Sequence, residues 1–310
     1  MKISLITTVF NEEKTIDRFL TSIFQQSKLP DEVLIVDGGS KDGTVKSIKD
    51  KLASSKYKGK FHISIKEGNR SVGRNEAIMH ATGDIIACSD AGNILDKKWI
   101  ERITEPFRNK NIDVVAGYYE GLAKNIFQKC LIPYALVMPD KVDSNTFLPA
   151  TRSIAFTKAI WEKTGGFDER LSHNEDYAFA RKLKDVGARI IFAKDAIVYW
   201  IPRNTFKEAF IMFFRFAYGD AEAEIYRPKV VFLFSRYVLG TALIIFFFII
   251  HSHLILNSIY FIFILYILWS ILKNYRYVNH WKAFYLLPLL QFTADFAVIL
   301  GTITGLLNGI

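Results

Sequence analysis

The sequence predicts an α/β domain, with a mainly parallel mixed sheet flanked by helices, followed by a membrane region. Three observations lead to this fold class. Apolar strand-like runs alternate with helical segments in the first half, acidic residues follow predicted strands, and three long apolar runs follow Pro228. We expect a soluble domain over residues 1–204, an amphipathic segment over 205–229 and about three transmembrane helices over 230–310.

The first 90 residues carry the clearest pattern. Ile3–Phe10 and Glu32–Val36 are short apolar runs typical of buried strands, and the segment between them has apolar residues at positions 16, 19, 20, 23 and 24, the spacing of an amphipathic helix. Phe61–Lys66, Ser71–Ala81 and Asp84–Ser89 then read as strand, helix and strand. This repetition predicts parallel pairing through right-handed crossovers.

The second half is less regular. Ile112–Tyr119 and Ala150–Phe156 are predicted strands, and Asn174–Val186 is a predicted helix. Pro139–Thr146 is short, polar and without a pattern. It is interpreted either as a mobile loop over a site or as a simple connection.

Acidic residues stand at the ends of predicted parallel strands, where open sheets bind ligands. Phe10–Glu12, Asp37 and Asp90 all lie at such ends. Asp37 precedes two glycines, which let a ligand approach the backbone, and its carboxylate can accept a hydrogen bond from a nucleobase N–H. The alternative for Asp37 is that it only stabilises its own turn.

Further candidates follow along the chain. Asp90 suits a hard divalent cation that carries a diphosphate. Arg74 and Asn75 lie in the first turns of a predicted helix, where the guanidinium can meet phosphate or order the acidic loop. Glu175 and Asp176 open another helix, so one of them is either a general base for an acceptor hydroxyl or an acid that favours the helix N-terminus.

Taken in order, these segments resemble the family 2 glycosyltransferases of the GT-A fold. The resemblance covers roughly residues 3–200 and is carried by seven segments. They are Thr7-Thr8-Val9-Phe10-Asn11-Glu12, Val36-Asp37-Gly38-Gly39-Ser40-Lys41-Asp42-Gly43-Thr44, Gly73-Arg74-Asn75, Gly83-Asp84, Ser89-Asp90-Ala91-Gly92, Gly165-Gly166-Phe167-Asp168-Glu169 and Asn174-Glu175-Asp176.

The resemblance implies transfer of a sugar from a nucleotide donor. It implies that Asp37 reads the base, that Asp90 lies at the metal–diphosphate site, and that Asp176 is the catalytic base with Glu175 beside it. The donor-binding residues that it implies are Thr8, Val9, Glu12, Asp37, Gly39, Arg74, Asn75, Ser89 and Asp90.

The sequence departs from the family pattern in two places. The family's metal motif usually has a second Asp two positions after the first, and here that position is Gly92. A single carboxylate can still hold Mg²⁺ or Mn²⁺, because such ions keep several waters. The tryptophan-containing motif of processive synthases is replaced by Phe214-Arg215-Phe216-Ala217-Tyr218-Gly219, which favours transfer of single sugars.

The apolar runs Val230–Ile250, Leu254–Leu272 and Ala283–Leu307 each approach or exceed the roughly 20 residues that a membrane-spanning helix needs. The first two predict a hairpin that turns at His251–His253, and the basic, aromatic loop Lys273–Lys282 predicts a cytoplasmic interface.

Two charged residues lie in these runs. Arg236 is close enough to the start of the first run to snorkel. Asp295 interrupts the third, and is either functional or a contact between helices. Ahead of them, Thr205–Tyr226 alternates Phe with charged residues, which suits a helix in the membrane interface or one packed under the soluble domain.

Composition limits the partners. The net charge of +9 is spread along the chain, so it indicates attraction to anionic cytoplasmic lipid rather than to nucleic acid. The only cysteines, Cys88 and Cys130, form no motif, and no signal peptide opens the chain. We therefore expect a multi-pass protein of the cell membrane whose soluble, catalytic domain faces the cytoplasm.

Three interpretations compete. The first is a glycosyltransferase that acts, with inversion, on a hydroxyl of a lipid-linked or membrane-proximal acceptor. The second is a polyprenyl-phosphate glycosyltransferase, in which the acceptor is already an anion and needs no base. The third is a non-catalytic membrane protein that keeps the fold. The sequence names neither the sugar, nor the nucleotide, nor the oligomeric state.

Overall fold

A computed structural model describes residues 1–144 and 146–308, and the chain forms two compact units. Unit 1 comprises Met1–Leu122 and Met138–Ile201, and unit 2 comprises Ala123–Val137 and Pro202–Ile310. Unit 2 is therefore assembled from two separate stretches of sequence. The domain boundary that the sequence predicts at residue 204 stays a prediction.

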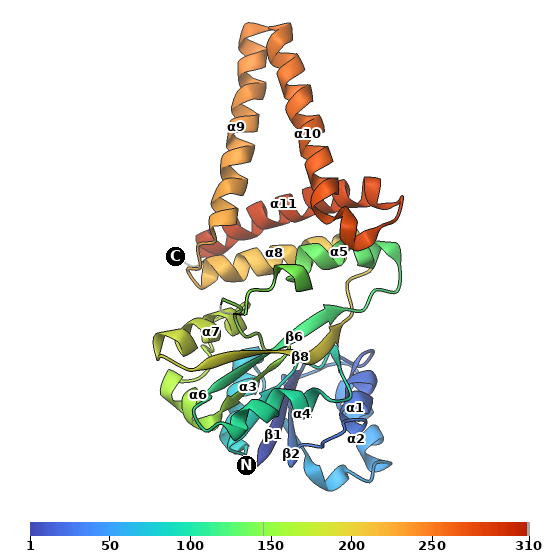
Figure 1. Ribbon diagram of the computed structural model, residues 1–310, viewed down its shortest axis with the longest axis vertical. Helices are drawn as coiled ribbons and strands as arrows, with labels where there is room; N and C mark the ends of the chain where they lie inside the picture. Colours follow the sequence, from blue (N-terminus) through green and yellow to red (C-terminus); the bar gives the residue numbers. More distant parts are fainter. Residues whose placement is uncertain (145, 309–310) are drawn as a thin grey trace. The chain divides into compact units, whose positions relative to one another are not determined.

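Unit 1 is built on a mixed sheet (Figure 1). The sheet has eight strands in the order β3-β2-β1-β4-β7-β6-β8-β5. Four strand pairs are parallel, namely β1–β2, β1–β4, β2–β3 and β6–β8, and three pairs, β4–β7, β6–β7 and β5–β8, are antiparallel. The predicted mainly parallel, mixed sheet is confirmed. Its strands are β1 (Ile3–Val9), β2 (Glu32–Asp37), β3 (Phe61–Ile65), β4 (Ile85–Cys88), β5 (Asn93–Leu95), β6 (Val114–Gly121), β7 (Ile154–Thr157) and β8 (Ile190–Trp200).

Helices cover both faces of this sheet, because its central strands are apolar on both sides. Val33 and Ile35 of β2 belong to one core with residues of α1, α2 and α4, whereas Leu34 and Val36 belong to a second core with α3, α6 and α7. The α-helices of unit 1 are α1 (Ile16–Phe24), α2 (Thr44–Ala53), α3 (Arg70–His80), α4 (Trp99–Thr104), α6 (Lys158–Thr164) and α7 (Glu175–Asp185), and its 3₁₀ turns are Lys58–Lys60, Glu105–Arg108 and Pro139–Lys141.

The second half of unit 1 differs in part from the sequence prediction. The strands expected at Ile112–Tyr119 and Ala150–Phe156 are present as β6 and β7, but β5 and β8 were not predicted. The segment Pro139–Thr146 begins with a 3₁₀ turn, and it contains residue 145, which lies outside the described residues.

Unit 2 is helical. Its helices are α5 (Ile126–Ala135), α8 (Phe206–Glu222), α9 (Pro228–Ile250), α10 (His253–Val278) and α11 (Ala283–Asn308). The α5 helix is bound within this unit, since Cys130 and Leu131 are fully buried and the Tyr134 hydroxyl donates to the Leu287 carbonyl over 2.9 Å. The α8 helix begins with a capping box formed by Thr205 and Glu208.

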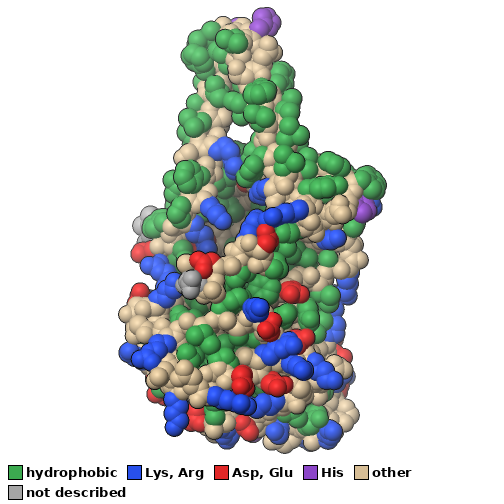
Figure 2. All heavy atoms as spheres, in the orientation of Figure 1, with side chains coloured by type: hydrophobic (Ala, Val, Ile, Leu, Met, Phe, Trp, Pro, Cys, Tyr) green, Lys and Arg blue, Asp and Glu red, His purple; other side chains and the backbone are tan. Residues whose placement is uncertain are grey.

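Three helices of unit 2, α9, α10 and α11, are long and apolar enough to cross a membrane. The first two form a hairpin, and hydrophobic side chains cover it (Figures 1 and 2). In α9 and α10 only 6% of the most apolar segment is buried within the protein, whereas in α11 the share is 44%.

The α11 helix lies alongside α8 rather than parallel to the hairpin (Figure 1). Small residues allow this close approach: a Cβ added to Gly301 would be 2.4 Å from the Phe214 carbonyl oxygen, and one added to Gly305 would be 2.7 Å from that of Tyr218. Glycines four residues apart are a common device for bringing apolar helices together. The third predicted apolar run, which forms α11, thus packs against α8 of the predicted amphipathic segment.

Candidate active site

The predicted site lies in unit 1, at the carboxyl edge of its parallel strands. Asp37 is the last residue of β2 and is paired in register with Val9, the last residue of β1. Asp90 follows the end of β4 by two residues, and β4 is the neighbour of β1 on its other side. The sequence prediction that these acids share one edge of the sheet agrees with this topology.

The carboxylate of Asp37 has one engaged and one unpaired oxygen. Its Oδ1 accepts the backbone N–H groups of Gly39 and Ser40 over 3.0 and 2.9 Å, and Gly39 has a φ of +94°, which favours glycine. Its Oδ2 is buried and has no hydrogen-bond partner among residues 1–144 and 146–308. Asp37 therefore stabilises its own turn, and it also offers a buried acceptor to a donor from outside the chain.

Arg74 of α3 joins three segments of the site. Its guanidinium is almost completely buried, with Nη1 donating to Oε1 of Glu175 over 2.6 Å. Its Nη2 donates to Oδ1 of Asp90 and to Oγ1 of Thr151, both over 2.9 Å. Of the two roles expected for Arg74, ordering the acidic residues is the one that these contacts describe.

Arg74 and the carboxylates of Asp90, Glu175 and Asp176 are called the Arg74 hub below. The three carboxylates differ in the direction in which their pKa is shifted. Burial alone would raise the pKa of Asp90 and of Glu175, but the Arg74 charge, helped by Arg70, outweighs it and lowers the pKa of both groups. For Asp176, burial and the negative charge of Glu175 raise the pKa above its ordinary value. Asp176 is thus the carboxylate of the three that binds a proton most readily.

The start of α7 presents Glu175 and Asp176 differently. Asn174 occupies the N-cap position in a left-handed conformation, with a φ of 54°. Glu175 is turned to Arg74, while Oδ1 of Asp176 accepts the N–H of Tyr177 over 2.8 Å. Asp176 satisfies one N–H of the first helical turn, as the capping alternative expects, and remains half-buried.

Asn75 binds protein groups with both ends of its amide. Its Nδ2 donates to the Phe167 carbonyl and to Glu169, each over 2.9 Å, and its Oδ1 accepts from the Phe167 N–H and the Trp161 indole over 3.0 and 3.3 Å. These contacts hold the turn around Gly166. They are the contacts of a positioning residue, and the role of Asn75 in donor binding stays a prediction.

The other predicted donor residues lie at the strand ends. Glu12 donates its N–H to Thr44 over 2.8 Å, and its carboxylate accepts the hydroxyl of Thr15. Thr8 packs under α3, where a Cβ on Gly73 would be 2.6 Å from its methyl group. Ser89 donates to the carbonyl of Arg152 over 2.8 Å.

Sequence reasoning missed Thr151 and Arg152. The guanidinium of Arg152 lies over the rings of Tyr119 and Trp200, 5.6 and 5.4 Å from their centroids. It is half-buried, and in the described part of the chain it has no ion pair or hydrogen bond. Its positive charge acts on Asp90 and Asp176. No motif surrounds it, and a lone arginine at a strand start gives no signal.

The residues at Asp90 fit a divalent cation held by one carboxylate. In the part of the chain that the structure describes, no three His, Cys, Asp or Glu side chains are grouped to hold a metal ion. Oδ1 of Asp90 is engaged by Arg74 and Thr151, which leaves Oδ2 for a ligand. A Cβ added at Gly92 would meet nothing within 4 Å, so there is room beside Asp90 for waters or phosphate oxygens.

Two glycosyltransferase family models match this chain. The family described as "Glycosyl transferase family 2" matches residues 4–129, and "Glycosyl transferase family group 2" matches residues 117–296, more than half of the chain. The glycosyltransferase AglE of Haloferax volcanii is 25% identical over 233 residues, 71% of this chain and 73% of that protein. The O-antigen chain rhamnosyltransferase RfbN of Salmonella typhimurium is 26% identical over 227 residues, 69% and 71% of the two chains.

Solved structures share the fold. The mannosyltransferase PcManGT from Pyrobaculum calidifontis, in complex with GDP-Man and Mn²⁺, superposes with a TM-score of 0.66 at 17% identity, over 99% of this chain and 87% of that one. TarS of S. aureus, in complex with UDP-GlcNAc, superposes with a TM-score of 0.52 at 18% identity, over 69% and 66%. The GT-A fold predicted from the sequence is confirmed.

Proposed function

This chain belongs to the family 2 glycosyltransferases. We propose that it transfers a single sugar, with inversion, from a nucleotide-diphosphate sugar to a hydroxyl of a lipid-linked or membrane-proximal acceptor. It is a nucleotide-sugar-dependent enzyme, which excludes the non-catalytic interpretation of the sequence. The observation that carries the proposal is the Arg74 hub, because it joins Asp90 to the Glu175-Asp176 pair.

We assign the donor to the edge formed by β1, β2 and β4. The unpaired Oδ2 of Asp37 would accept a base N–H, and a buried acceptor without a partner costs roughly 1–3 kcal/mol, so the ligand would relieve that cost. Asp90 would hold a divalent cation. When bound, Mg²⁺ or Mn²⁺ neutralises charge on the leaving diphosphate.

We assign proton transfer to Asp176. Its raised pKa suits a group that takes the proton of an acceptor hydroxyl. Glu175 is committed to the buried Arg74, so it positions the start of α7. Inversion requires the hydroxyl to attack the sugar opposite the departing diphosphate, with Asp176 on the acceptor side.

One observation favours the second candidate, transfer to a polyprenyl phosphate. The guanidinium of Arg152 has open hydrogen-bond donors and acts electrostatically on Asp176, so it could receive an anionic acceptor. In this alternative the phosphate is itself the nucleophile, and Asp176 has no proton to accept.

We further propose that the protein is a multi-pass membrane protein with unit 1 on the cytoplasmic side. The three apolar helices support membrane association, and the basic segment Lys273–Lys282 supports the orientation.

The decisive experiment offers purified protein a panel of nucleotide sugars and measures released nucleoside diphosphate. Each active donor is then tested with a hydroxyl-bearing lipid glycoside and with a short polyprenyl phosphate. The main proposal expects turnover with the hydroxyl-bearing acceptor, and a fall of about 10²–10⁴-fold in that turnover for Asp176→Asn. Turnover with the phosphate alone, unaffected by Asp176→Asn, would establish the second candidate instead.

A further inference from the structure

Unit 2 contains a group of polar side chains among its apolar helices, which we call the intramembrane cluster. Its members come from the three helices that are apolar enough to cross a membrane. They are Arg236 and Tyr237 of α9, Tyr266, Trp269 and Lys273 of α10, and Gln291 and Asp295 of α11.

Asp295 is satisfied by neutral donors. Its buried carboxylate accepts the Tyr237 hydroxyl over 3.0 Å, the Gln291 amide over 2.8 Å and the hydroxyl of Tyr266. A buried carboxylate with this many donors does not depend on a tight ion pair. This leaves the nearby arginine available for other contacts.

Arg236 is engaged only loosely. Its Nη2 is 3.5 Å from each oxygen of Asp295, longer than the roughly 2.7–2.9 Å of a charge-assisted bond. Among the residues that the structure describes, Asp295 is its only hydrogen-bond partner. The side chain is 40% exposed, so most of its five N–H donors remain open to a ligand.

A second cation stands against the same aromatic ring. The Arg236 guanidinium is 5.7 Å and the Lys273 Nζ 4.3 Å from the centroid of Trp269. Lys273 also donates to Oε1 of Gln291 over 2.6 Å, and Arg236 lies 4.6 Å from the Tyr266 ring. Aromatic faces and the amide hold the two cations in place.

Both cations lie toward the same end of the hairpin. Arg236 is eight residues after the start of α9, and Lys273 is five before the end of α10, about 12 and 8 Å along the helices. With those helix ends in the headgroup layer, the cations reach the boundary between headgroups and acyl chains. Figure 2 shows an opening between the two helices of the hairpin, with Lys or Arg side chains at its lower edge.

Two like charges brought together among apolar helices repel each other, and an anionic group placed between them would lower that cost. We propose that the intramembrane cluster binds the phosphate headgroup of a membrane lipid, with Arg236 and Lys273 as its cationic ligands. The lipid chains would lie against the apolar surface of α9 and α10. This inference goes beyond sugar transfer and does not depend on the donor or the acceptor.

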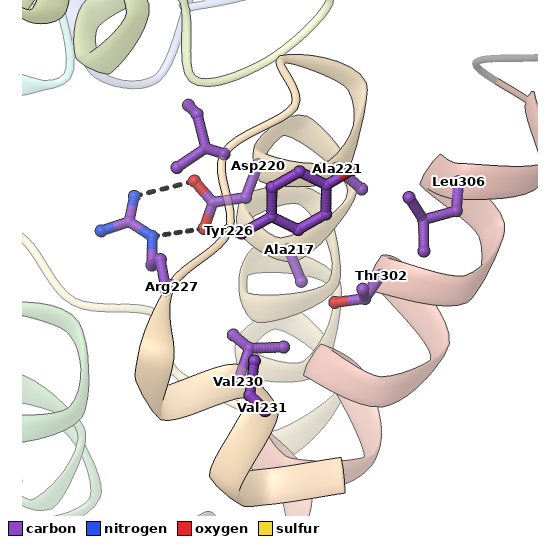
Figure 3. A pocket seen from close by; sticks show the side chains of 10 residues that line it. Ala217, Asp220, Ala221, Tyr226, Arg227, Val230, Val231, Thr302 and Leu306 are labelled. Atoms are coloured by element: carbon purple, nitrogen blue, oxygen red, sulfur yellow. Dashed lines mark hydrogen bonds and ion pairs between the residues drawn. The ribbon is translucent and has the colours of Figure 1, made fainter.

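A cavity of unit 2 that borders another cation, Arg227, does not fit such a ligand. A cavity of about 40 Å³ lies between α8, the start of α9 and α11, and its walls are mostly apolar side chains (Figure 3). Its arginine, Arg227, is already bound to both oxygens of Asp220 over 2.5 and 2.8 Å. It has neither the room nor the free charge for a headgroup.

The experiment measures lipid retention by native mass spectrometry of the purified full chain, without a sugar donor. Phosphatidylglycerol and phosphatidylcholine with identical acyl chains are compared. We expect wild type to retain phosphatidylglycerol preferentially, and Arg236→Gln or Lys273→Gln to lower that preference about fivefold each, the value of one cation near a lipid headgroup. Arg276→Gln, an exposed basic residue of the same helix, is the matched control and should keep the preference.

A purely structural cluster predicts otherwise. If these residues only hold the helices together, Arg236→Gln lowers thermal stability but leaves the lipid preference unchanged, and the proposal is overturned. Arg236→Lys guards against unfolding of the Gln variant, because it retains the charge and should retain most of the preference. Loss of the preference in a folded Arg236→Lys variant equal to that of Arg236→Gln would contradict a role for charge.

The source of the phosphate is tested by competition. Farnesyl phosphate, phosphatidylglycerol and inorganic phosphate are added separately to wild type carrying a photoactivatable phosphatidylglycerol. Displacement by either lipid, but not by millimolar inorganic phosphate, supports a lipid headgroup site. Displacement by inorganic phosphate as efficient as by lipid would show an anion site that needs no lipid. Nucleotide release from the donor panel is measured apart, so failure here leaves the sugar-transfer proposal intact.

Discussion

The buried guanidinium of Arg74 donates from Nη1 to Oε1 of Glu175 over 2.6 Å, although the two lie 101 positions apart in the chain. Neither group is tolerable alone inside the protein, because a buried charge without its partner is strongly unfavourable. The pair therefore fixes the start of α7 against α3, and with it the position of Asp176.

Loss of this pair should destabilise unit 1. Arg74→Met leaves Glu175 buried without its cation, and removal of one partner of a buried pair typically costs about 3–5 kcal/mol. Chemical denaturation monitored by far-UV circular dichroism measures the change. The matched control is Arg170→Met, which removes an exposed guanidinium from its pair with the half-buried Asp168 and should cost about 1 kcal/mol or less. Equal stability of the two variants would contradict a structural role for the hub.

The same pair predicts an acid dependence of stability. The folded-state pKa of Glu175 is lowered from 4.5, so the folded protein binds this proton less readily than the unfolded chain does. The stability that the pair contributes is present above pH 4.5 and is lost as the pH falls through the lowered folded-state pKa. Unfolding measured between pH 7 and pH 3 should show this loss in wild type and a weaker one in Glu175→Gln.

Asp176 should control turnover rather than donor affinity. Asp176→Asn keeps the shape and the bond to Tyr177 but cannot accept a proton, so kcat should fall by about 10²–10⁴-fold with a hydroxyl acceptor. In wild type the raised pKa should move the acidic limb of the rate profile to higher pH, and the variant should lose that limb. Asp185→Asn, at the other end of α7, is the control. If Asp176→Asn keeps a kcat near that of wild type, Asp176 only stabilises the start of α7 and is not the general base.

Asp37 should control donor affinity. Asp37→Asn can still accept the turn N–H groups with its amide oxygen, but it replaces the unpaired Oδ2 with a donor. Binding of the nucleoside diphosphate should weaken by about 1–3 kcal/mol in titration calorimetry. Asp42→Asn, in the same loop, should bind as wild type does. If Asp37→Asn also binds the nucleoside diphosphate with wild-type affinity, the nucleobase does not contact Asp37.

The orientation can be tested with single cysteines, because the native Cys88 and Cys130 are buried. We expect Asn279→Cys, at the end of α10, to be protected from an impermeant maleimide in intact cells and to react after lysis. Ser252→Cys, between α9 and α10, should react in intact cells. The reverse pattern would place unit 1 on the other side of the membrane.

The sequence predicted best where local pattern and tertiary environment agree. Strands β1, β2 and β4 are central and buried on both faces, so they appear as continuous apolar runs ending at Asp37 and Asp90. Strand β8 was missed because its exposed Lys194-Asp195 interrupts the run, where its pairing with β6 also shifts register. Strand β5 has only three residues, too few for a periodicity.

The residues of the candidate site likewise divide into those that local sequence predicts and those that depend on tertiary contacts. Asp37 and Asp90 could be predicted because strand ends place them. The position of Arg152 could not, since it depends on Tyr119 and Trp200 coming close through the pairing of β6 with β8. The two roles weighed for Arg74 could be separated only by the contacts that join it to Glu175, Asp90 and Thr151.

The insertion of Ala123–Val137 into unit 2 has a practical consequence for protein production. The chain passes between the units three times, so truncation after Ile201 would remove the apolar helices but retain α5. The side chains of Cys130 and Leu131, fully buried in the intact protein, would then be exposed to water, and Tyr134 would lose its acceptor on α11. A soluble fragment of unit 1 therefore requires two cuts, one that ends the chain near Ile201 and one that replaces α5 with a short polar linker.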